Sequence, residues 1–246
     1  MPDSGSRVAL IPGGARGIGH AVALALLAEG WRVAVAYRTS RAEAESVVAA
    51  ASASGGEALS VLADVSDRAA AQSLVQAVAA RWGRIDALIN AFGPYRRIGL
   101  LDETPEGWHA MFDNNLHPVW YLTEAVAPIM AAQGWGRVVN FGLVNADHVA
   151  AHPNLTAYAI AKTGVLVLTR TYARLLAKDG ITVNAVSPGY LDTGMPIGEV
   201  ERLSAGIPAG HVGTPDDAVA AVRFLLSEEA GYVNGATIQL SGGWGL

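Results

Sequence analysis

The stretch Arg7-Val-Ala-Leu-Ile-Pro-Gly-Gly-Ala-Arg-Gly-Ile-Gly19 decides the fold of this chain. Its apolar run, residues 7–11, predicts a buried strand. The Ala-, Val- and Leu-rich segment that follows predicts a helix through Ala28, which Gly30 ends. A strand, a glycine turn and a helix in this order predict the opening unit of a dinucleotide-binding fold.

A steric requirement explains why this turn is rich in glycine. Backbone amides at the start of a helix can approach a pyrophosphate closely only where no β-carbon blocks them. The spacing Gly13-x-x-x-Gly17-Ile18-Gly19 meets that requirement. The alternative, a tight strand-to-helix turn without a ligand, is weakened by the strand and helix on either side. We therefore expect these residues to bind a dinucleotide.

The rest of the chain repeats the alternation of strand and helix to its end. It predicts a single α/β domain over residues 1–246, a Rossmann-type doubly wound parallel sheet of about seven strands with helices on both faces. The further expected strands are 32–37, 58–62, 85–90, 137–141, 181–186 and 237–240, and the helices 42–53, 69–82, 104–133 (interrupted at Pro118 and Pro128), 155–177 and 215–226.

Two arginines favour NADP(H) over NAD(H). No Asp or Glu, the usual ribose ligand of NAD, stands between Trp31 and Ser40. Arg38 follows the second strand and Arg16 lies in the glycine turn, and guanidinium groups bind a 2′-phosphate well. The alternative is that both are solvated surface charges.

Asp64, followed by Val65, ends the third strand, where ligands bind in open parallel sheets. Its carboxylate is expected to accept a hydrogen bond from the adenine amino group. The alternative is a residue that caps the next helix.

Tyr158 and Lys162 are four residues apart in an expected helix, so both side chains can point into one pocket. A free tyrosine ionises near ~10, and a neighbouring cation lowers that pKa. Such a pair suits proton exchange in a carbonyl/alcohol interconversion. The alternative is a surface lysine beside a packed tyrosine.

Composition excludes several classes of function. With 51% hydrophobic and 16% charged residues, the chain of 246 residues can form a large core. A net charge of −5 without a basic block argues against nucleic-acid partners. Cysteine is absent and the six histidines lack metal-ligand spacing, so no metal is expected. Neither a signal peptide nor an apolar run of ~18 residues is visible, which predicts no membrane span and a cytoplasmic protein.

These landmarks together resemble the short-chain dehydrogenase/reductase family over essentially the whole chain, in particular its 3-oxoacyl-carrier-protein reductases. The matching positions are Gly13, Gly17 and Gly19, the acid Asp64, the segment 88–93 (usually N-N-A-G, with Asn90 and Gly93), Asn115, the pair Tyr158 and Lys162, and Pro188, Gly189 and Thr193.

The resemblance implies a role for each residue. Tyr158 would exchange a proton with the substrate oxygen while hydride moves to or from nicotinamide. Lys162 would bind the nicotinamide ribose and lower the pKa of Tyr158. Asn115 would hold a water that links Lys162 to solvent; alternatively it satisfies backbone groups at the kink before Pro118. Residues 195–210 would form a substrate lid. A homodimer or homotetramer would assemble through the helices 104–133 and 155–177.

Three departures from the family pattern stand out. Pro12 replaces a threonine, and Ala91-Phe92 replaces Asn-Ala. The serine that normally follows the fifth strand is missing: its place falls on Gly142 or Leu143, or on Asn145 when thirteen residues are counted back from Tyr158. Loss of such a donor can cost ~10²-fold in rate. Asn145 is our candidate replacement, His148 a weaker one, and a loop-forming role for Asn145 the alternative.

The function expected is therefore an NADP(H)-dependent oxidoreductase that interconverts a small carbonyl and an alcohol. A 3-oxoacyl thioester is one expected substrate, although docking an acyl carrier protein favours a basic patch and only Arg96-Arg97 suggests one. A pteridine, cyclic ketone or quinone is the alternative within the enzyme class. An NADP-binding regulator with degraded catalysis is the alternative outside it.

Overall fold

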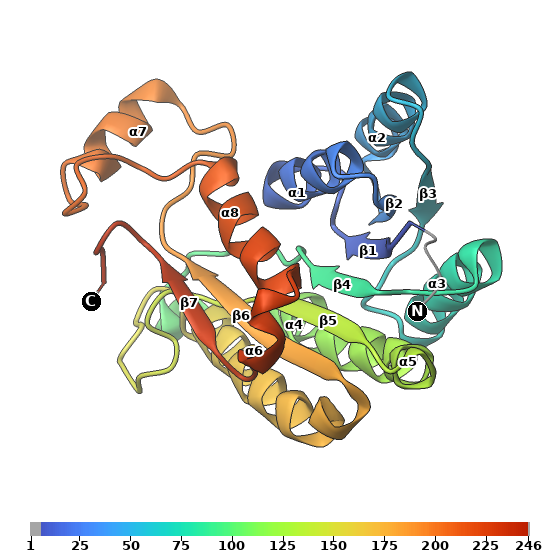
Figure 1. Ribbon diagram of the computed structural model, residues 1–246. Helices are drawn as coiled ribbons and strands as arrows, with labels where there is room; N and C mark the ends of the chain where they lie inside the picture. The colour runs from blue at the N-terminus through green and yellow to red at the C-terminus, as the bar shows by residue number, and fades with distance from the viewer. Residues whose placement is uncertain (1–5, 246) are drawn as a thin grey trace.

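The computed structural model describes residues 6–245 and contains one parallel sheet of seven strands between two layers of helices (Figure 1). The strands lie in the order β3-β2-β1-β4-β5-β6-β7, and each neighbouring pair is parallel. Their bounds are β1 Val8–Pro12, β2 Arg32–Tyr37, β3 Ala58–Leu62, β4 Ala87–Asn90, β5 Gly136–Phe141, β6 Ile181–Pro188 and β7 Thr237–Leu240.

The helices cover both faces of the sheet. One layer holds α1 (Gly17–Ala28), α2 (Arg41–Ala53) and α8 (Pro215–Leu226); the other holds α3 (Arg68–Trp82), α4 (Pro105–Asn115), α5 (His117–Gln133) and α6 (Thr156–Leu176). α7 (Ile197–Ser204) stands apart, and three short 3-10 turns complete the structure, η1 (Leu100–Asp102), η2 (Ala177–Asp179) and η3 (Glu229–Tyr232).

The central strands are apolar throughout because both of their faces are covered. In β1, Ala9 and Ile11 pack against the α1 layer, whereas Val8 and Leu10 pack against the α3 and α5 layer. All four are fully buried, as expected for successive side chains that point to opposite faces. The α/β fold class predicted from the sequence is confirmed.

The expected helix 104–133 is two helices that meet at Leu116. Pro118 lies in the first turn of α5, where its missing N–H has no helical partner to lose. The expectation that Pro128 interrupts this helix was wrong, because Pro128 lies inside α5. Burial of Leu122, Val126 and Met130 against the sheet and α3 holds the helix together across the proline.

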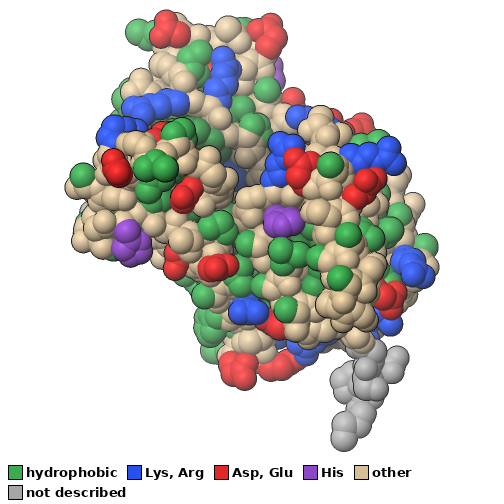
Figure 2. All heavy atoms as spheres, turned by 90° about the horizontal axis from the view of Figure 1, so that it is seen from above, with side chains coloured by type: hydrophobic (Ala, Val, Ile, Leu, Met, Phe, Trp, Pro, Cys, Tyr) green, Lys and Arg blue, Asp and Glu red, His purple; other side chains and the backbone are tan. Residues whose placement is uncertain are grey.

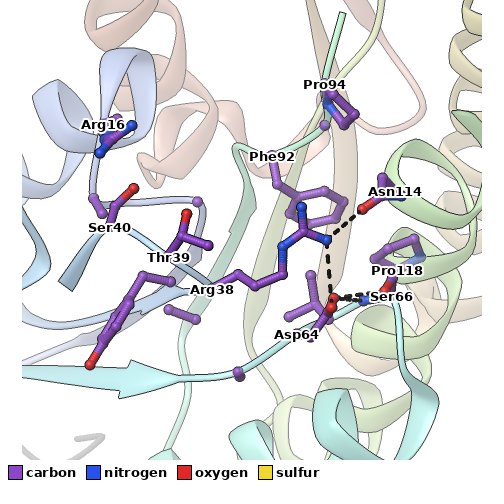
Figure 3. A pocket seen from close by; sticks show the side chains of 17 residues that line it. Arg16, Arg38, Thr39, Ser40, Asp64, Ser66, Phe92, Pro94, Asn114 and Pro118 are labelled. Carbon is purple, nitrogen blue, oxygen red and sulfur yellow. Dashed lines mark hydrogen bonds and ion pairs between the residues drawn. The ribbon is translucent and has the colours of Figure 1, made fainter. Parts of the chain in front are cut away.

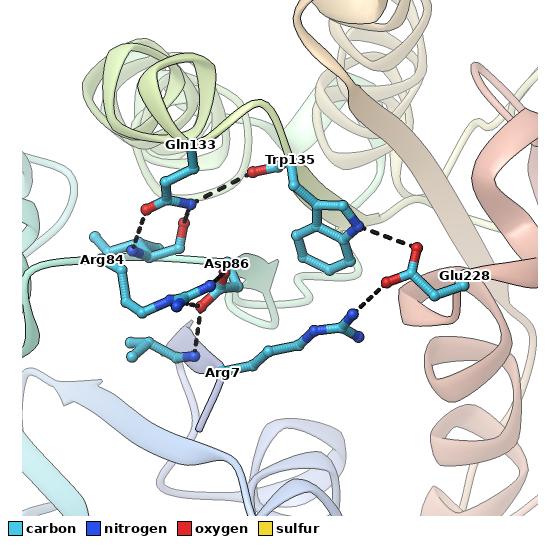
Figure 4. Close-up of polar contacts among 8 residues, drawn as sticks. Arg7, Arg84, Asp86, Gln133, Trp135 and Glu228 are labelled. Atoms are coloured by element: carbon cyan, nitrogen blue, oxygen red, sulfur yellow. Dashed lines mark hydrogen bonds and ion pairs between the residues drawn. The ribbon is translucent and has the colours of Figure 1, made fainter. Parts of the chain in front are cut away.

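A polar clamp fixes the amino end of the sheet (Figure 4). Asp86, 1% exposed, accepts the N–H of Val8 at 2.8 Å and two hydrogen bonds from Arg84. Gln133 at the end of α5 bonds both backbone groups of Ile85. These contacts tie the segment before β4 to β1 and α5.

The order of the strands reverses at β1: β2 and β3 lie on one side of it, and β4 to β7 lie on the other. Ligands bind at such a reversal, outside the carboxyl ends of the strands. Figure 2, seen from above Figure 1, shows the surface hollowed between two lobes, with Lys or Arg side chains beside the hollow. Among residues 6–245 no helix combines the length and apolar character that crossing a bilayer requires.

Candidate active site

A cavity of about 450 Å³ opens at the carboxyl ends of β1, β2 and β3 (Figure 3). It brings together the predicted cofactor residues Gly13, Arg16, Arg38, Asp64, Val65 and Gly93. Phe92, which the sequence analysis noted as a departure from the family pattern, also lines it. The sequence reasoning missed other lining residues, among them Thr39, Ser40, Ser66, Pro94 and Asn114. Thr39 and Ser40 carry hydroxyls directly after Arg38, which is a signal that could have identified them.

The glycine turn packs against the turn after β4. A β-carbon on Gly13, whose φ is +80°, would lie 2.4 Å from the carbonyl oxygen of Ala91. One on Gly19 would lie 2.5 Å from the carbonyl oxygen of Gly13. Thr193, from the loop after β6, lies against Gly17 with its methyl group 3.5 Å from the position of a β-carbon. Glycine is thus required at positions 13 and 19 for the close packing of the glycine turn, whereas the contact between Gly17 and Thr193 is of ordinary van der Waals length.

Both predicted phosphate-binding arginines lie at the cavity, and both contact carboxylates. Arg38 reaches Asp64 at 3.5 Å and the side-chain oxygen of Asn114 at 3.2 Å. Arg16 pairs with Glu43 of α2. In Figure 3, Arg38 extends toward Asp64 and Asn114, whereas Arg16 lies on the opposite side. Two guanidinium groups therefore flank the cavity.

Asp64 is not a helix cap, since the N-cap of α3 is Asp67. Its carboxylate accepts hydrogen bonds from the hydroxyl and the N–H of Ser66. These bonds, together with Arg38, lower the pKa of Asp64, so the group is an anion and a hydrogen-bond acceptor.

Tyr158 and Lys162 lie on one face of α6, as predicted. Lys162 is 4% exposed, and its Nζ donates a hydrogen bond to the carbonyl oxygen of Phe141 at 2.9 Å. The same atom is 5.7 Å from the centre of the Tyr158 ring. The alternative of a surface lysine is thereby excluded.

The expectation that Lys162 lowers the pKa of Tyr158 was wrong for this structure. Burial raises the pKa of Tyr158 to about 12, and the phenol of Tyr95 adds to the shift. Burial lowers the pKa of Lys162 to about 8. The ammonium is directed to Phe141, so desolvation outweighs its attraction for the phenolate.

Asn115, 1% exposed, ends α4 and holds the turn after β4. Its amide donates to the carbonyl oxygen of Pro94 at 3.2 Å, and its buried Oδ1 has no partner among the described residues. A β-carbon on Gly93 would lie 2.1 Å from that oxygen. Asn115 thus bonds to backbone, as in the alternative interpretation, but at Pro94 rather than at the kink before Pro118.

Asn90 begins a buried polar chain that the sequence reasoning did not find. Its amide donates to Asn140 at 2.7 Å, and Asn140 donates to the hydroxyl of Thr169 at 2.9 Å. Polar residues near the carboxyl ends of apolar strands, Asn90 in β4 and Asn140 in β5, were the available signal. The chain joins β4 and β5 to α6, two turns beyond Lys162, and so steadies the helix that carries the Tyr158–Lys162 pair.

No serine stands between residues 142 and 157, where the family pattern predicts one, and the Ser187 hydroxyl beside Gly142 is buried without a hydrogen-bond partner among the described residues. Gly142 cannot accept a side chain easily, since a β-carbon would lie 2.5 Å from the hydroxyl oxygen of Ser187. Leu143 packs on the buried cluster of Ala146, Leu166 and Ala185.

Asn145 has φ +60°, a conformation that asparagine tolerates well. Its side-chain amide donates to the carbonyl oxygen of Gly245, while its N–H donates to Gln239 at 3.2 Å. The exposed His148 lies 3.3 Å from Asp147. The structure therefore directs the amide of Asn145 to the C-terminal tail.

That tail, residues 241–245, joins several parts of the site. Gly189, which follows Pro188, lies against Ser241 and Trp244, and the Trp244 and Tyr190 rings are 4.6 Å apart. Gly242 accepts the N–H of Ala209 at 2.9 Å. The expected lid, residues 195–210, contains α7 and is attached at this end to the tail.

Comparisons with known proteins agree with this geometry. A family model described as enoyl-(acyl carrier protein) reductase matches residues 13–245. A 3-oxoacyl-[acyl-carrier-protein] reductase of Synechocystis sp. is 38% identical over 240 residues, which cover 97% of this chain and 96% of that protein. The corresponding reductase of Staphylococcus aureus is 34% identical over 242 residues, 97% of this chain and 98% of that protein.

Solved structures extend the likeness. Levodione reductase is 34% identical and matches with a TM-score of 0.90 over 96% of both chains. A blue fluorescent protein from a metagenomic library, in complex with NADPH, is 30% identical and matches with a TM-score of 0.90 over 98% of both chains. These likenesses run through the whole sheet, the glycine turn and the helix of Tyr158, and the chain therefore belongs to the short-chain dehydrogenase/reductase family of oxidoreductases.

Proposed function

We propose that this protein is an NADP(H)-dependent reductase that converts a small carbonyl compound to an alcohol, with Tyr158 as the proton donor. The observation that carries the proposal is the Tyr158–Lys162 pair on α6, anchored to the end of β5 by the bond from Lys162 to Phe141. β5 lies beside β4, and β4 lies beside β1 with its glycine turn. The proton donor and the glycine turn, residues 13–19, thus lie at the same edge of the sheet.

The residues at this edge fit a nicotinamide dinucleotide. Gly13 and Gly19 allow the glycine turn to pack closely on the turn after β4. This turn leads into the amino end of α1, where the amides of Gly17 and Ile18 would suit a pyrophosphate. The remaining assignments are Asp64 and Val65 to adenine, Asn90 and Gly93 to the adjoining ribose region, Lys162 to the nicotinamide ribose, and Pro188, Gly189 and Thr193 to the nicotinamide.

The preference for NADP(H) rests on Arg38 and Arg16, with the hydroxyls of Thr39 and Ser40 in the same cavity. A 2′-phosphate would replace the carboxylate partners that these arginines now contact. The NADPH complex of the metagenomic relative adds support.

When bound by these residues, a reduced nicotinamide dinucleotide would supply the hydride for the carbonyl carbon. Tyr158, with a pKa of about 12, is protonated at neutral pH and can give its proton to the carbonyl oxygen. The ammonium of Lys162 then stabilises the phenolate that remains. The unpartnered Oδ1 of Asn115 is suited to a water that returns a proton from solvent.

Two substrate classes follow from specific observations. The names of the Synechocystis and Staphylococcus relatives favour a 3-oxoacyl thioester. The Arg96 side chain forms a 2.7 Å ion pair with Glu103, which weakens the basic patch expected for an acyl carrier protein. The rings of Tyr95 and Tyr158 favour instead a small cyclic ketone, quinone or pteridine.

Assembly and location complete the proposal. Large apolar side chains are exposed on α5 and α6, namely Trp120, Ile160, Val167 and Leu175. Their burial between copies of the chain would form a homodimer or homotetramer. We place this assembly in the cytoplasm.

The test is an assay of NADPH and NADH oxidation with 3-oxoacyl thioesters, cyclic diketones, quinones and dihydropterins. The proposal expects turnover with at least one class and faster turnover with NADPH. NADPH binding without turnover of any class would instead support a nucleotide-binding regulator.

A further inference from the structure

The catalytic centre needs a second hydrogen-bond donor for the substrate oxygen. In the proposed reaction negative charge develops on this oxygen, and a fixed donor there is worth ~10² to 10³-fold in rate. After β5, Gly142 and Leu143 offer no polar side chain, Asn145 donates to Gly245, and the hydroxyl of Ser187 is completely buried. The Ser187 hydroxyl has no partner among the described residues but is out of reach of a substrate in this structure, so we consider other segments that border Tyr158.

Tyr95 lies directly beside the proton donor. Its ring meets the ring of Tyr158 edge to face, with 5.3 Å between centroids and 88° between planes. At 58% exposed, Tyr95 remains accessible to a substrate that reaches Tyr158. The ring contact fixes the two rings relative to each other and holds Tyr95 beside the proton donor.

The loop that carries Tyr95 is held on both sides. Asn115 donates to the carbonyl oxygen of the preceding residue, Pro94. Beyond Tyr95, Ile98 and Leu100 donate to the backbone oxygens of Asn154 and Pro153 at 2.8 and 2.9 Å. The Arg96–Glu103 ion pair closes the same loop. Tyr95 is thus placed before a substrate arrives, which is the condition for an effective donor.

Tyr95 is also in the correct protonation state. Partial burial and the nearby phenol of Tyr190 raise its pKa, and the opposing effect of Arg97 is smaller. The hydroxyl therefore keeps its proton at neutral pH and can donate a hydrogen bond.

We propose that Tyr95 is a catalytic residue whose hydroxyl donates a hydrogen bond to the substrate carbonyl oxygen, in place of the serine that this chain lacks. This inference rests on the proposed carbonyl reductase function. Tyr95 transfers no proton; it holds the oxygen while Tyr158 protonates it. Asn115, through Pro94, acts as a positioning residue for Tyr95.

The test compares Tyr95→Phe with Asn145→Gly. Tyr95→Phe keeps the ring contact and removes one oxygen atom. Asn145→Gly removes the competing amide, and glycine accepts the φ of +60° without strain. For each variant we would measure kcat and KM with the best carbonyl of the panel, NADPH affinity by fluorescence titration, and Tm.

The proposal expects Tyr95→Phe to lower kcat about 10²-fold, with NADPH affinity and Tm unchanged, and to lower it more than Asn145→Gly does. Tyr232→Phe, which removes the hydroxyl of a fully exposed tyrosine of η3, is the matched control and should stay within about threefold of the wild type. An unchanged kcat in Tyr95→Phe would overturn the role of Tyr95 and leave the reductase function standing. A loss confined to Asn145→Gly would overturn it in favour of Asn145. A wild-type protein that binds NADPH but reduces no carbonyl would overturn both proposals.

Discussion

Lys162 donates a hydrogen bond to the carbonyl oxygen of Phe141, 2.9 Å away, and this bond fixes α6 to the carboxyl end of β5. The ammonium is almost completely buried, so its charge depends on pH in the range where the enzyme is expected to work.

We predict that carbonyl reduction slows as pH rises above about 8. The pKa of Lys162 is lowered to about 8 by burial, so its charge is present below that pH and is lost above it. Without the charge, the phenolate left on Tyr158 is no longer stabilised. A profile of kcat from pH 6 to 10 checks this. Lys162→Met should be slow at every pH, whereas Lys178→Met, which changes the exposed second lysine of the chain, should keep the wild-type profile. A wild-type kcat that stays the same from pH 6 to pH 10 would contradict the prediction.

Arg38→Ala should weaken NADPH binding about 10- to 100-fold and NADH binding by less than threefold, because a charged hydrogen bond to phosphate contributes about 1.5–3 kcal/mol. Titration of both nucleotides measures the difference. Arg41→Ala is the matched control, since Arg41 is also exposed but pairs with Glu45 along α2. Equal losses for the two nucleotides would refute a phosphate site at Arg38.

Much of the fold could be predicted because strong local patterns determine it. β2, β3, β7 and α8 have the bounds expected from their apolar runs and terminal Gly or Pro residues. Pro128 could not be predicted, because burial of one side of α5 offsets the hydrogen bond that the proline removes. Nor could α7, whose eight residues bury no side chain completely.

The site was predictable as far as its motifs extend. The cavity brings Arg38 and Asp64 together from separate strand ends, as parallel topology requires. The protonation states of Tyr158 and Lys162 were not predictable, because burial by distant segments determines them. Tyr95 was missed for the same reason: its contact with Tyr158 joins residues far apart in the sequence.

Gly13→Ala should destabilise the fold and abolish NADPH binding. A β-carbon there would lie 2.4 Å from the Ala91 carbonyl oxygen and would separate the glycine turn after β1 from the turn after β4. Gly55→Ala is the control: its φ, +74°, is similar to the +80° of Gly13, but nothing lies within 4 Å of its β-carbon position. We expect a loss of about 1–2 kcal/mol of stability from Gly55→Ala, by backbone strain, with NADPH affinity unchanged. Comparable effects of the two substitutions on NADPH affinity would contradict the close packing described here.

The central claim is that Tyr158 protonates the substrate oxygen beside a bound nicotinamide. Tyr158→Phe, assayed for NADPH oxidation with a carbonyl that the wild-type protein reduces, tests it most directly. The account predicts that kcat falls by about 10³-fold or more while NADPH binds with its wild-type affinity, because only the proton donor is removed. A variant that still reduces the carbonyl at a rate near that of the wild type would contradict it.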